Sequence, residues 1–209
     1  MKKINPFKER DLTTQLLFPT ISWSSLSQFL YYDREQWFQS YVLGVRGGIN
    51  PAMEAGIEIG ERWATDETFL TEVPRRPEIF EHALKVKFGA ITLTGHMDGW
   101  SPSIKELSEL KTAQNKNKWN EKSVREHGQL DFYALLLWLH DKIRPEDISM
   151  RLIAVPVEMS GDFKVKQCGP AQIIPTSRTM LGIATFGALI KKTHKEMLAF
   201  VEMKKLYTK

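Results

Sequence analysis

Three charged residues in the middle of the chain have the types and the spacing for metal-assisted chemistry. Glu109 and Lys111 lie two positions apart in the segment SELKT, so on a β-strand their side chains share one face while Leu110 points the other way, into the core. Asp98 ends the preceding alternating segment, and it reaches the same point if the two strands pair, since paired strands lie only about 4.8 Å apart. The pattern predicts two carboxylates and one lysine at one end of a sheet.

Hydrolysis of a phosphodiester bond would use each of these groups. Mg²⁺ prefers oxygen ligands and keeps several waters, so Asp98, Glu109 and the backbone carbonyl of Leu110 would hold the ion and leave room for a phosphate. The ion lowers the pKa of a bound water, while Lys111 orients or deprotonates that water or stabilises the developing negative charge. The competing interpretation is a turn aspartate and a solvated Glu109–Lys111 ion pair; the occurrence of all three in this strand context favours the site.

The elements that would position these residues follow from hydrophobic periodicity. Apolar residues at helical spacing predict helices, alternation around Gly89-Ala90 predicts a β-hairpin, and serine N-caps among Ser22, Ser24 and Ser25 begin the first helix. The first expected elements are a helix broken once within 20–44 and a helix over Met53–Leu70. Three strands follow in HALKVKFG, ITLTGHMDGW and KELSELKT, and then a helix over about Glu121–Asp141. The chain ends with strands in SMRLIAVPVE and DFKVKQCG around a turn at 160–162, and a helix over about Arg178–Leu206.

This order predicts an α/β fold with a central mixed β-sheet flanked by helices. A chain of 209 residues with 42% hydrophobic and 26% charged residues is ordinary for one compact domain, and no repeat or flexible linker divides it. We expect a single domain over 1–209, with N-terminal helices at 20–70, a catalytic core at 80–176 and a C-terminal helix at 178–207.

Charge and cysteine content indicate the kind of partner and the cellular compartment of the protein. A formal net charge of +4 suits a polyanionic partner without demanding one. Cys168 is the single cysteine, so the chain alone forms no disulfide, and a reducing environment fits best. No stretch approaches the roughly 18 apolar residues of a membrane span, and the N-terminus lacks an apolar signal region. We expect a cytoplasmic protein, in the host cytoplasm if a phage encodes it, without membrane association.

An ordered set of motifs resembles those of a known nuclease superfamily. The motifs are G-x-x-D at Gly95 and Asp98, E-x-K-T at Glu109, Lys111 and Thr112, Q-x-x-x-Y at Gln129 and Tyr133, and, earlier, S-x-S-x-L-x-x-F at Ser22 to Phe29 with Y-V-L-G at Tyr41 to Gly44. In order and spacing they resemble the PD-(D/E)XK superfamily, most closely its RecB-type branch. The resemblance covers roughly Ser22 to Val157.

The resemblance implies a restriction-endonuclease-like core and metal-dependent cleavage of DNA. Asp98 and Glu109 would be metal ligands, Lys111 the catalytic base or charge stabiliser, and Gln129 and Tyr133 would flank the site. Mg²⁺ would be the cofactor, and Mn²⁺ could substitute. We expect an exonuclease or a single-strand cutter, of the sort that phages and mobile elements use in recombination, repair or genome processing. Its partners would be DNA and a recombination or replication protein. Both a monomer and an oligomer are compatible with the sequence.

The chain departs from that branch at two places. The branch usually has a histidine or glutamate that binds metal in a helix before the hairpin, and Gly60 stands where the histidine would be expected. Glu61 or Glu58 would substitute, or these glutamates form a solvated helix face. The cysteines of iron–sulfur members are missing, and Cys168 has no companions, so we expect no iron–sulfur cluster.

Further residues are candidates for contact with the substrate. Arg125, Gln129 and Tyr133 are spaced four apart, which predicts one stripe on a helix face, beside the site or simply exposed to solvent. The loop QNKNKWNEKSVRE interleaves cations with an aromatic ring, a composition that suits DNA phosphates and a stacked base. The alternative is a solvated loop with a buried tryptophan. The candidate DNA-binding residues are Lys116, Lys118, Trp119, Lys122 and Arg125.

Two other functions compete with the DNA nuclease. A nuclease-derived DNA-binding or adaptor protein that no longer cuts would not need Asp98, Glu109 and Lys111 together, so their presence favours the enzyme. Gly60 in place of the histidine favours the inactive protein. A metal-dependent RNA nuclease would differ only in its substrate.

Overall fold

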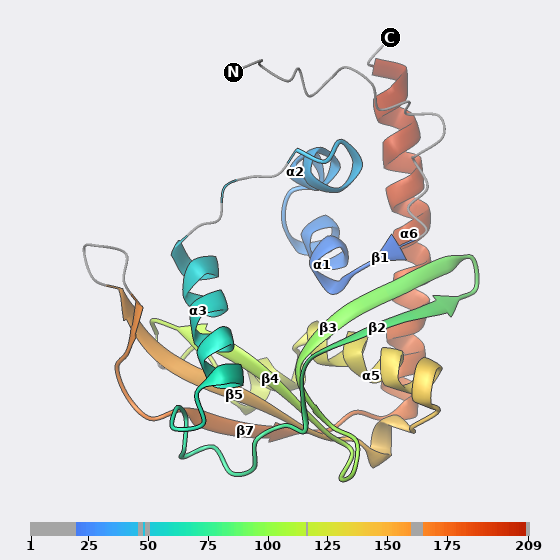
Figure 1. Cartoon of the computed structure of the whole chain (residues 1–209). Coiled ribbons are helices and arrows are strands. Elements are labelled where there is room, and N and C mark those ends of the chain that lie inside the picture. The colour runs from blue at the N-terminus through green and yellow to red at the C-terminus, as the bar shows by residue number, and fades with distance from the viewer. Residues whose placement is uncertain (1–19, 46–47, 49–50, 116, 160–164, 208–209) are drawn as a thin grey trace.

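The strands among the described residues form one mixed sheet of seven strands with helices on both faces (Figure 1). The computed structural model describes residues 20–45, 48, 51–115, 117–159 and 165–207. The strands are Thr20–Ile21 (β1), Ile79–Phe88 (β2), Ile91–Ser101 (β3), Glu106–Ala113 (β4), Ser149–Met159 (β5), Val165–Gln167 (β6) and Gln172–Thr176 (β7). The helices are Trp23–Tyr31 (α1), Arg34–Trp37 (α2), the π-helix Phe38–Val42 (η1), Pro51–Thr65 (α3), Glu121–Arg125 (α4), Gly128–Asp141 (α5), the 3-10 helix Pro145–Asp147 (η2) and Met180–Tyr207 (α6). The predicted α/β class is confirmed.

The predicted hairpin is present and continues directly toward the candidate site. Phe88 pairs with Ile91 across the two-residue turn Gly89-Ala90, and the antiparallel ladder of β2 and β3 extends from there to Ile79 and Trp100. Gly89 has a φ of 64°, in the left-handed region where glycine has no steric penalty. The turn therefore fixes which residues of the two strands face each other.

β3 changes partners along its length, and this change creates a fork in the sheet. Near its start, Thr92 and Leu93 pair in parallel with β1, while only its last three residues pair antiparallel with β4, from Gly99 opposite Ser108 onwards. β4 instead stays paired in parallel with β5 along its whole length. The two strands that carry Asp98 and Glu109 thus separate at these residues.

Hydrophobic clusters pack on the two faces of the sheet. Successive residues of β5 alternate between them: Leu152 and Ala154 join the cluster under α1, α5 and α6, whereas Ile153 and Val155 join the cluster under α3. This alternation is the period of a strand that is buried on both faces. The sheet is therefore held between helices at the strand that supports β4.

The N-terminal helical segment is broken once, as predicted. Ser22 is the N-cap of α1, and its side chain accepts a 3.2 Å hydrogen bond from Ser25 N–H. After Tyr32, Asp33 caps α2 by accepting from two backbone N–H groups of the next turn. Both α1 and α2 thus begin with a side-chain acceptor for unpaired N–H groups.

The predicted helix over Glu121–Asp141 is wrong as a single element, because it forms two helices. α4 ends at Arg125 and α5 begins at Gly128. Arg178 donates to the carbonyls of Val124 and His127, which lie at this corner. Both carbonyls also accept backbone N–H groups, Val124 from His127 and His127 from Leu130, so Arg178 adds a tertiary contact at a corner that local hydrogen bonds already form.

Smaller differences have local causes. α3 ends at Thr65 instead of Leu70, and Asp66 accepts from Thr68 N–H in the turn that follows. β1 and β7 were not predicted, because β1 is too short to show alternation and Pro175 of β7 suggests a turn. The expected turn at 160–162 lies outside the described residues. The long C-terminal helix is present, and among the described helices none is both long and apolar enough to cross a membrane.

Candidate active site

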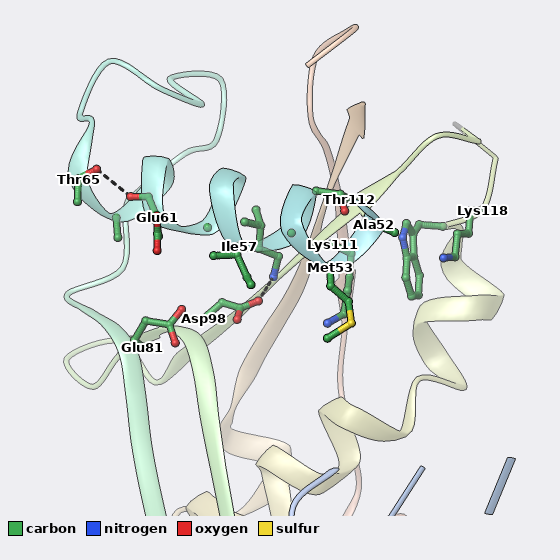
Figure 2. Close-up of a pocket in the computed structure, with 15 residues that line it drawn as sticks. Ala52, Met53, Ile57, Glu61, Thr65, Glu81, Asp98, Lys111, Thr112 and Lys118 are labelled. Atoms are coloured by element: carbon green, nitrogen blue, oxygen red, sulfur yellow. Dashed lines mark hydrogen bonds between the residues drawn. The ribbon is translucent and has the colours of Figure 1, made fainter. Parts of the chain in front are cut away.

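Asp98 lies at the fork between β3 and β4 and bridges it with its side chain. Its Oδ2 accepts a 2.7 Å hydrogen bond from the backbone N–H of Leu110 (Figure 2). The carboxylate takes up this donor just where the backbone ladder between the two strands stops. The fork therefore holds Asp98 against the segment that contains Glu109 and Lys111.

Glu109 and Lys111 share one face of β4, as the spacing predicted. Lys111 Nζ donates to Glu109 Oε1 at 2.5 Å, while the side chain of Leu110 joins the cluster under α3 on the other face. Glu109 is fully buried, and the Lys111 side chain keeps 26% of its surface exposed. The ammonium group thus lies between a buried carboxylate and the solvent.

Burial controls the protonation of the two carboxyl groups. Burial, and then the nearby charge of Asp98, raise the pKa of Glu109 to about 8, although Lys111 acts against both. Burial also raises the pKa of Asp98 more than Lys111 and the Leu110 N–H lower it. Burial lowers the pKa of Lys111, but attraction to the two carboxylates outweighs this effect and leaves the pKa above its usual value. The Lys111 ammonium group therefore stays charged, and both carboxyl groups hold a proton at higher pH than they would when exposed to water.

A cavity of about 870 Å³ opens beside these residues. α3 forms one wall, the hairpin and β4 form the floor, and the loop before α4 forms the far wall (Figure 2). The lining residues that matter for function are Gly56, Gly60, Glu61, Glu81, Asp98, Leu110, Lys111, Lys118 and Trp119. A space of this size admits a nucleotide-sized group next to the carboxylates.

α3 packs one face against the sheet and turns another toward the cavity. Ile59 and Trp63 are buried in the cluster beneath it, whereas Gly56 and Gly60 line the cavity, where an added Cβ would meet nothing within 4 Å. Of the glutamates on this helix, Glu61 lines the cavity. Its role as a metal ligand remains a prediction.

Gln129 and Tyr133 form a hydrogen-bonded pair on α5. Gln129 Nε2 donates to Tyr133 Oη at 2.7 Å, and Tyr133 Oη donates to the backbone carbonyl of His96, two residues before Asp98. Neither side chain lines the cavity. The arrangement braces β3 from below the site, and the predicted catalytic roles of both residues remain predictions.

The expected stripe of Arg125, Gln129 and Tyr133 is wrong at its first member. Arg125 belongs to α4, and the chain turns at Glu126 and His127 before α5 begins, so the three residues do not share one helix face. The spacing of four residues implies a common face only within an unbroken helix.

The candidate DNA-binding loop contributes two residues to the cavity. Lys118 Nζ lies 5.5 Å from the centre of the Trp119 ring, and both residues line the far wall. Trp119 is also partly buried against His127, with ring centres 5.1 Å apart, so it is an anchor as well as a lining residue. Lys122 and Arg125 are exposed on α4 away from the lining, and Lys116 lies outside the described residues.

The site fits a divalent cation in its donor chemistry. Glu109 Oε2 is buried and meets no hydrogen-bond donor among the described residues, and the carboxyl within its reach, that of Asp98, is a second acceptor. The Glu109 side chain helps to lower the pKa of Asp98 through a hydrogen bond, and a divalent cation in place of the proton between the two buried carboxyls would balance their charge. In the described part of the chain, no three His, Cys, Asp or Glu side chains already converge as a metal-binding group. Oxygen ligands beyond this pair would have to come from elsewhere.

Glu81, which was not predicted as a site residue, lines the cavity on β2 beside Asp98. Its segment EIFEHALK suggests only an exposed strand end. The signal lay in the hairpin register: once Gly89-Ala90 is the turn and Phe88 faces Ile91, counting back along β2 puts Glu81 opposite Asp98.

Comparison with solved structures identifies the fold. An inferred exonuclease from Eubacterium rectale superposes with a TM-score of 0.59 at 9% identity, covering 97% of this chain and 87% of that chain. An alkaline exonuclease from Laribacter hongkongensis superposes with a TM-score of 0.52 at 12% identity, covering 91% of this chain and 94% of that chain. Its complex with dAMP gives the same values. The chain shares the fold of these exonucleases. No protein-family model matches the sequence, and no curated protein does either. At these identities the likeness establishes the exonuclease fold alone.

Proposed function

We propose that this protein is a Mg²⁺-dependent DNA nuclease, and specifically an exonuclease. The observation that carries the proposal is the meeting of Asp98, Glu109 and Lys111 at the fork of the sheet, at the floor of an open cavity. A merely structural ion pair would not need a fully buried carboxylate with an unsatisfied oxygen beside a second carboxyl. Hydrolysis of a phosphodiester by metal-bound water needs this set of groups.

The chain's own residues have separate tasks in this proposal. The pKa of Lys111 is raised, so its ammonium group stays charged at neutral pH. In the proposed site it would stabilise negative charge on the phosphate and orient or deprotonate the attacking water. Tyr133, through the His96 carbonyl, holds β3 in place so that Asp98 keeps its position.

Asp98, Glu109 and the backbone carbonyl of Leu110 would hold Mg²⁺, with Mn²⁺ able to replace it. When bound, the ion would lower the pKa of a coordinated water and neutralise charge on the phosphate. The buried Glu109 also binds Lys111, so it fixes the ammonium group close to the same point. No iron–sulfur cluster is part of the proposal.

DNA is the proposed substrate, and digestion from an end is the proposed mode. Lys118 and Trp119 on the cavity wall suit a phosphate and a stacked base, contacts that do not depend on sequence. The proteins that share the fold are described as exonucleases, and one was solved with the nucleotide dAMP. Both points support an exonuclease over a sequence-specific cutter.

We further propose that the protein belongs to the RecB-type branch of the PD-(D/E)XK superfamily. The support is the ordered set of motif residues, of which Asp98, Glu109 and Lys111 meet at one site. The pathway proposed is recombination, repair or phage genome processing in the cytoplasm, together with a recombination or replication partner. The oligomeric state would decide whether digestion is processive.

The test is cleavage of labelled single- and double-stranded DNA, linear and circular, with Mg²⁺, Mn²⁺ or EDTA. We expect metal-dependent cleavage of linear DNA that falls by about 100-fold or more in Lys111→Ala and Asp98→Ala. The matched control is Lys192→Ala, because Lys192 is 76% exposed on α6, remote from the cavity lining. It should cleave like the native chain.

Other outcomes of this experiment assign other functions. Cleavage of circular DNA would make the enzyme an endonuclease, and cleavage of RNA alone would overturn the choice of substrate. DNA binding without cleavage of any substrate would favour the inactive adaptor, for which Gly60 in place of a metal-binding histidine is the supporting observation.

A further inference from the structure

Glu109 leaves an acceptor that the fold does not satisfy. Its side chain is fully buried, Lys111 occupies Oε1, and Oε2 meets no donor in the described part of the chain. The Asp98 carboxyl beside it adds a second acceptor. A divalent cation at this point would take six or more oxygen ligands, more than these two side chains supply. A further carboxylate near the pair is therefore of interest.

Glu81 lies across the β2–β3 ladder from Asp98. Phe80 pairs with Gly99 and the pairing resumes one residue beyond, so Glu81 and Asp98 face each other between two ladder pairs. Both residues line the cavity, and Figure 2 shows the Glu81 carboxylate beside that of Asp98. The backbone of Glu81 has a φ of 49°, in the left-handed region that few residues other than glycine adopt. β2 is thus locally reshaped at the residue that faces Asp98.

The electrostatic neighbours of the pair also include Glu81. Partial burial and then repulsion from Asp98 raise the pKa of Glu81, and Glu81 contributes to the raised pKa of Glu109. Glu61, on the opposite wall of the cavity, is not among the described groups that shift the pKa of either carboxyl. Glu58 does not line the cavity.

We infer that Glu81 supplies the third carboxylate of the divalent-cation site, in the place expected for Glu61 or Glu58. This inference rests on the proposed function, because it concerns the same cation. No three acidic side chains among the described residues yet converge on one point, so the Glu81 side chain turns toward Asp98 when the ion binds. It is exposed, and exposed side chains change rotamer within nanoseconds.

The experiment measures Mn²⁺ binding to the full chain without DNA, by calorimetry and by the loss of the free-ion electron paramagnetic resonance signal. The variants are Glu81→Gln, Glu61→Gln and Glu58→Gln, each of which removes one charge and keeps the side-chain size. Asp98→Asn tests the cation site itself. Thermal unfolding in EDTA verifies that each variant is folded.

We expect Glu81→Gln to weaken Mn²⁺ binding by about 10- to 100-fold, Glu58→Gln to leave it unchanged, and Glu61→Gln to have a smaller effect than Glu81→Gln. If Asp98→Asn weakens binding while Glu81→Gln matches Glu58→Gln, or if Glu61→Gln has the larger effect, Glu81 is not the ligand and the proposed function stands. If Asp98→Asn also leaves binding unchanged, the cation site and the proposed function fail together.

Discussion

At the scale of single residues, the site is governed by two carboxyl groups that share a buried position. Asp98 accepts a hydrogen bond from the backbone N–H of Leu110, and Glu109 accepts one from the Lys111 ammonium group. The remaining carboxylate oxygen of Glu109 has no donor among the described residues. One ammonium group cannot fully compensate two buried carboxylates, so burial raises the pKa of both. A divalent cation would supply the missing charge.

This balance predicts how pH changes the response to metal. The pKa of Glu109 is about 8 in the fold against 4.5 ordinarily, so between these values the folded protein holds more protons than the unfolded chain. In EDTA the free energy of unfolding should therefore fall as pH rises through this window. Mg²⁺ competes with these protons, so the increase in Tm caused by Mg²⁺ should be larger at about pH 8 than at about pH 6.

Thermal unfolding with Mg²⁺ or EDTA at the two pH values measures this difference. Glu109→Gln, which cannot titrate, is the control and should remove most of the pH dependence. An equal rise in Tm at both values for the native chain would contradict the prediction.

At the scale of elements, glycines on α3 and β3 serve opposite purposes. Gly60 lines the cavity, and a Cβ there would meet nothing within 4 Å. Gly95 lies beneath α5, where a Cβ would lie 2.8 Å from Leu136 Cδ1 and 2.9 Å from Tyr133 Cε1. The first glycine leaves open space for a ligand, and the second lets a helix approach the strand that carries Asp98.

Substitution by alanine separates the two roles. Gly60→Ala should raise the free energy of unfolding by about 0.5–1 kcal/mol, because alanine is the better helix former and has room here. Gly95→Ala should lower it by about 1–3 kcal/mol, because the methyl group displaces Leu136 and Tyr133. Urea denaturation compares the two variants, and changes of the same sign would show that local space does not decide the effect.

At the scale of the whole molecule, Arg178 joins segments that are far apart in the sequence. It lies just before α6, pairs with Asp131 on α5, and donates to the carbonyls of Val124 and His127 at 3.1 and 3.3 Å. Its side chain is only 6% exposed. The start of the C-terminal helix is thereby fixed to the corner between α4 and α5, next to the Trp119 wall of the cavity.

Loss of this link should be costly. Arg178→Ala leaves Asp131 without its partner and removes the donor that joins the Val124 and His127 carbonyls to the start of α6, so we expect a decrease of about 3 kcal/mol in the free energy of unfolding. Arg144→Ala is the control, since the Arg144–Glu146 pair is 3.7 Å long and its arginine is 67% exposed, and it should cost less than about 1 kcal/mol. Equal losses in chemical denaturation would refute the structural role of Arg178.

The sequence by itself determined the features that depend on neighbours along the chain. The alternation of Glu109, Leu110 and Lys111, the Gly89-Ala90 turn and a serine N-cap within 22–25 were predicted because each follows from the period of a strand, the geometry of a turn or the end of a helix. These local rules were enough for the α/β class.

Only the tertiary structure decided what depends on contacts between distant segments. The fork at Asp98 exists because β4 pairs with only the last three residues of β3 and stays beside β5, the break before α5 coincides with the contacts of Arg178, and Glu81 joins the cavity because the hairpin brings β2 beside Asp98. None of these follows from a periodic pattern, because each requires partners that are tens of residues away. Burial, and with it the raised pKa of Glu109, likewise exists only once these segments pack together.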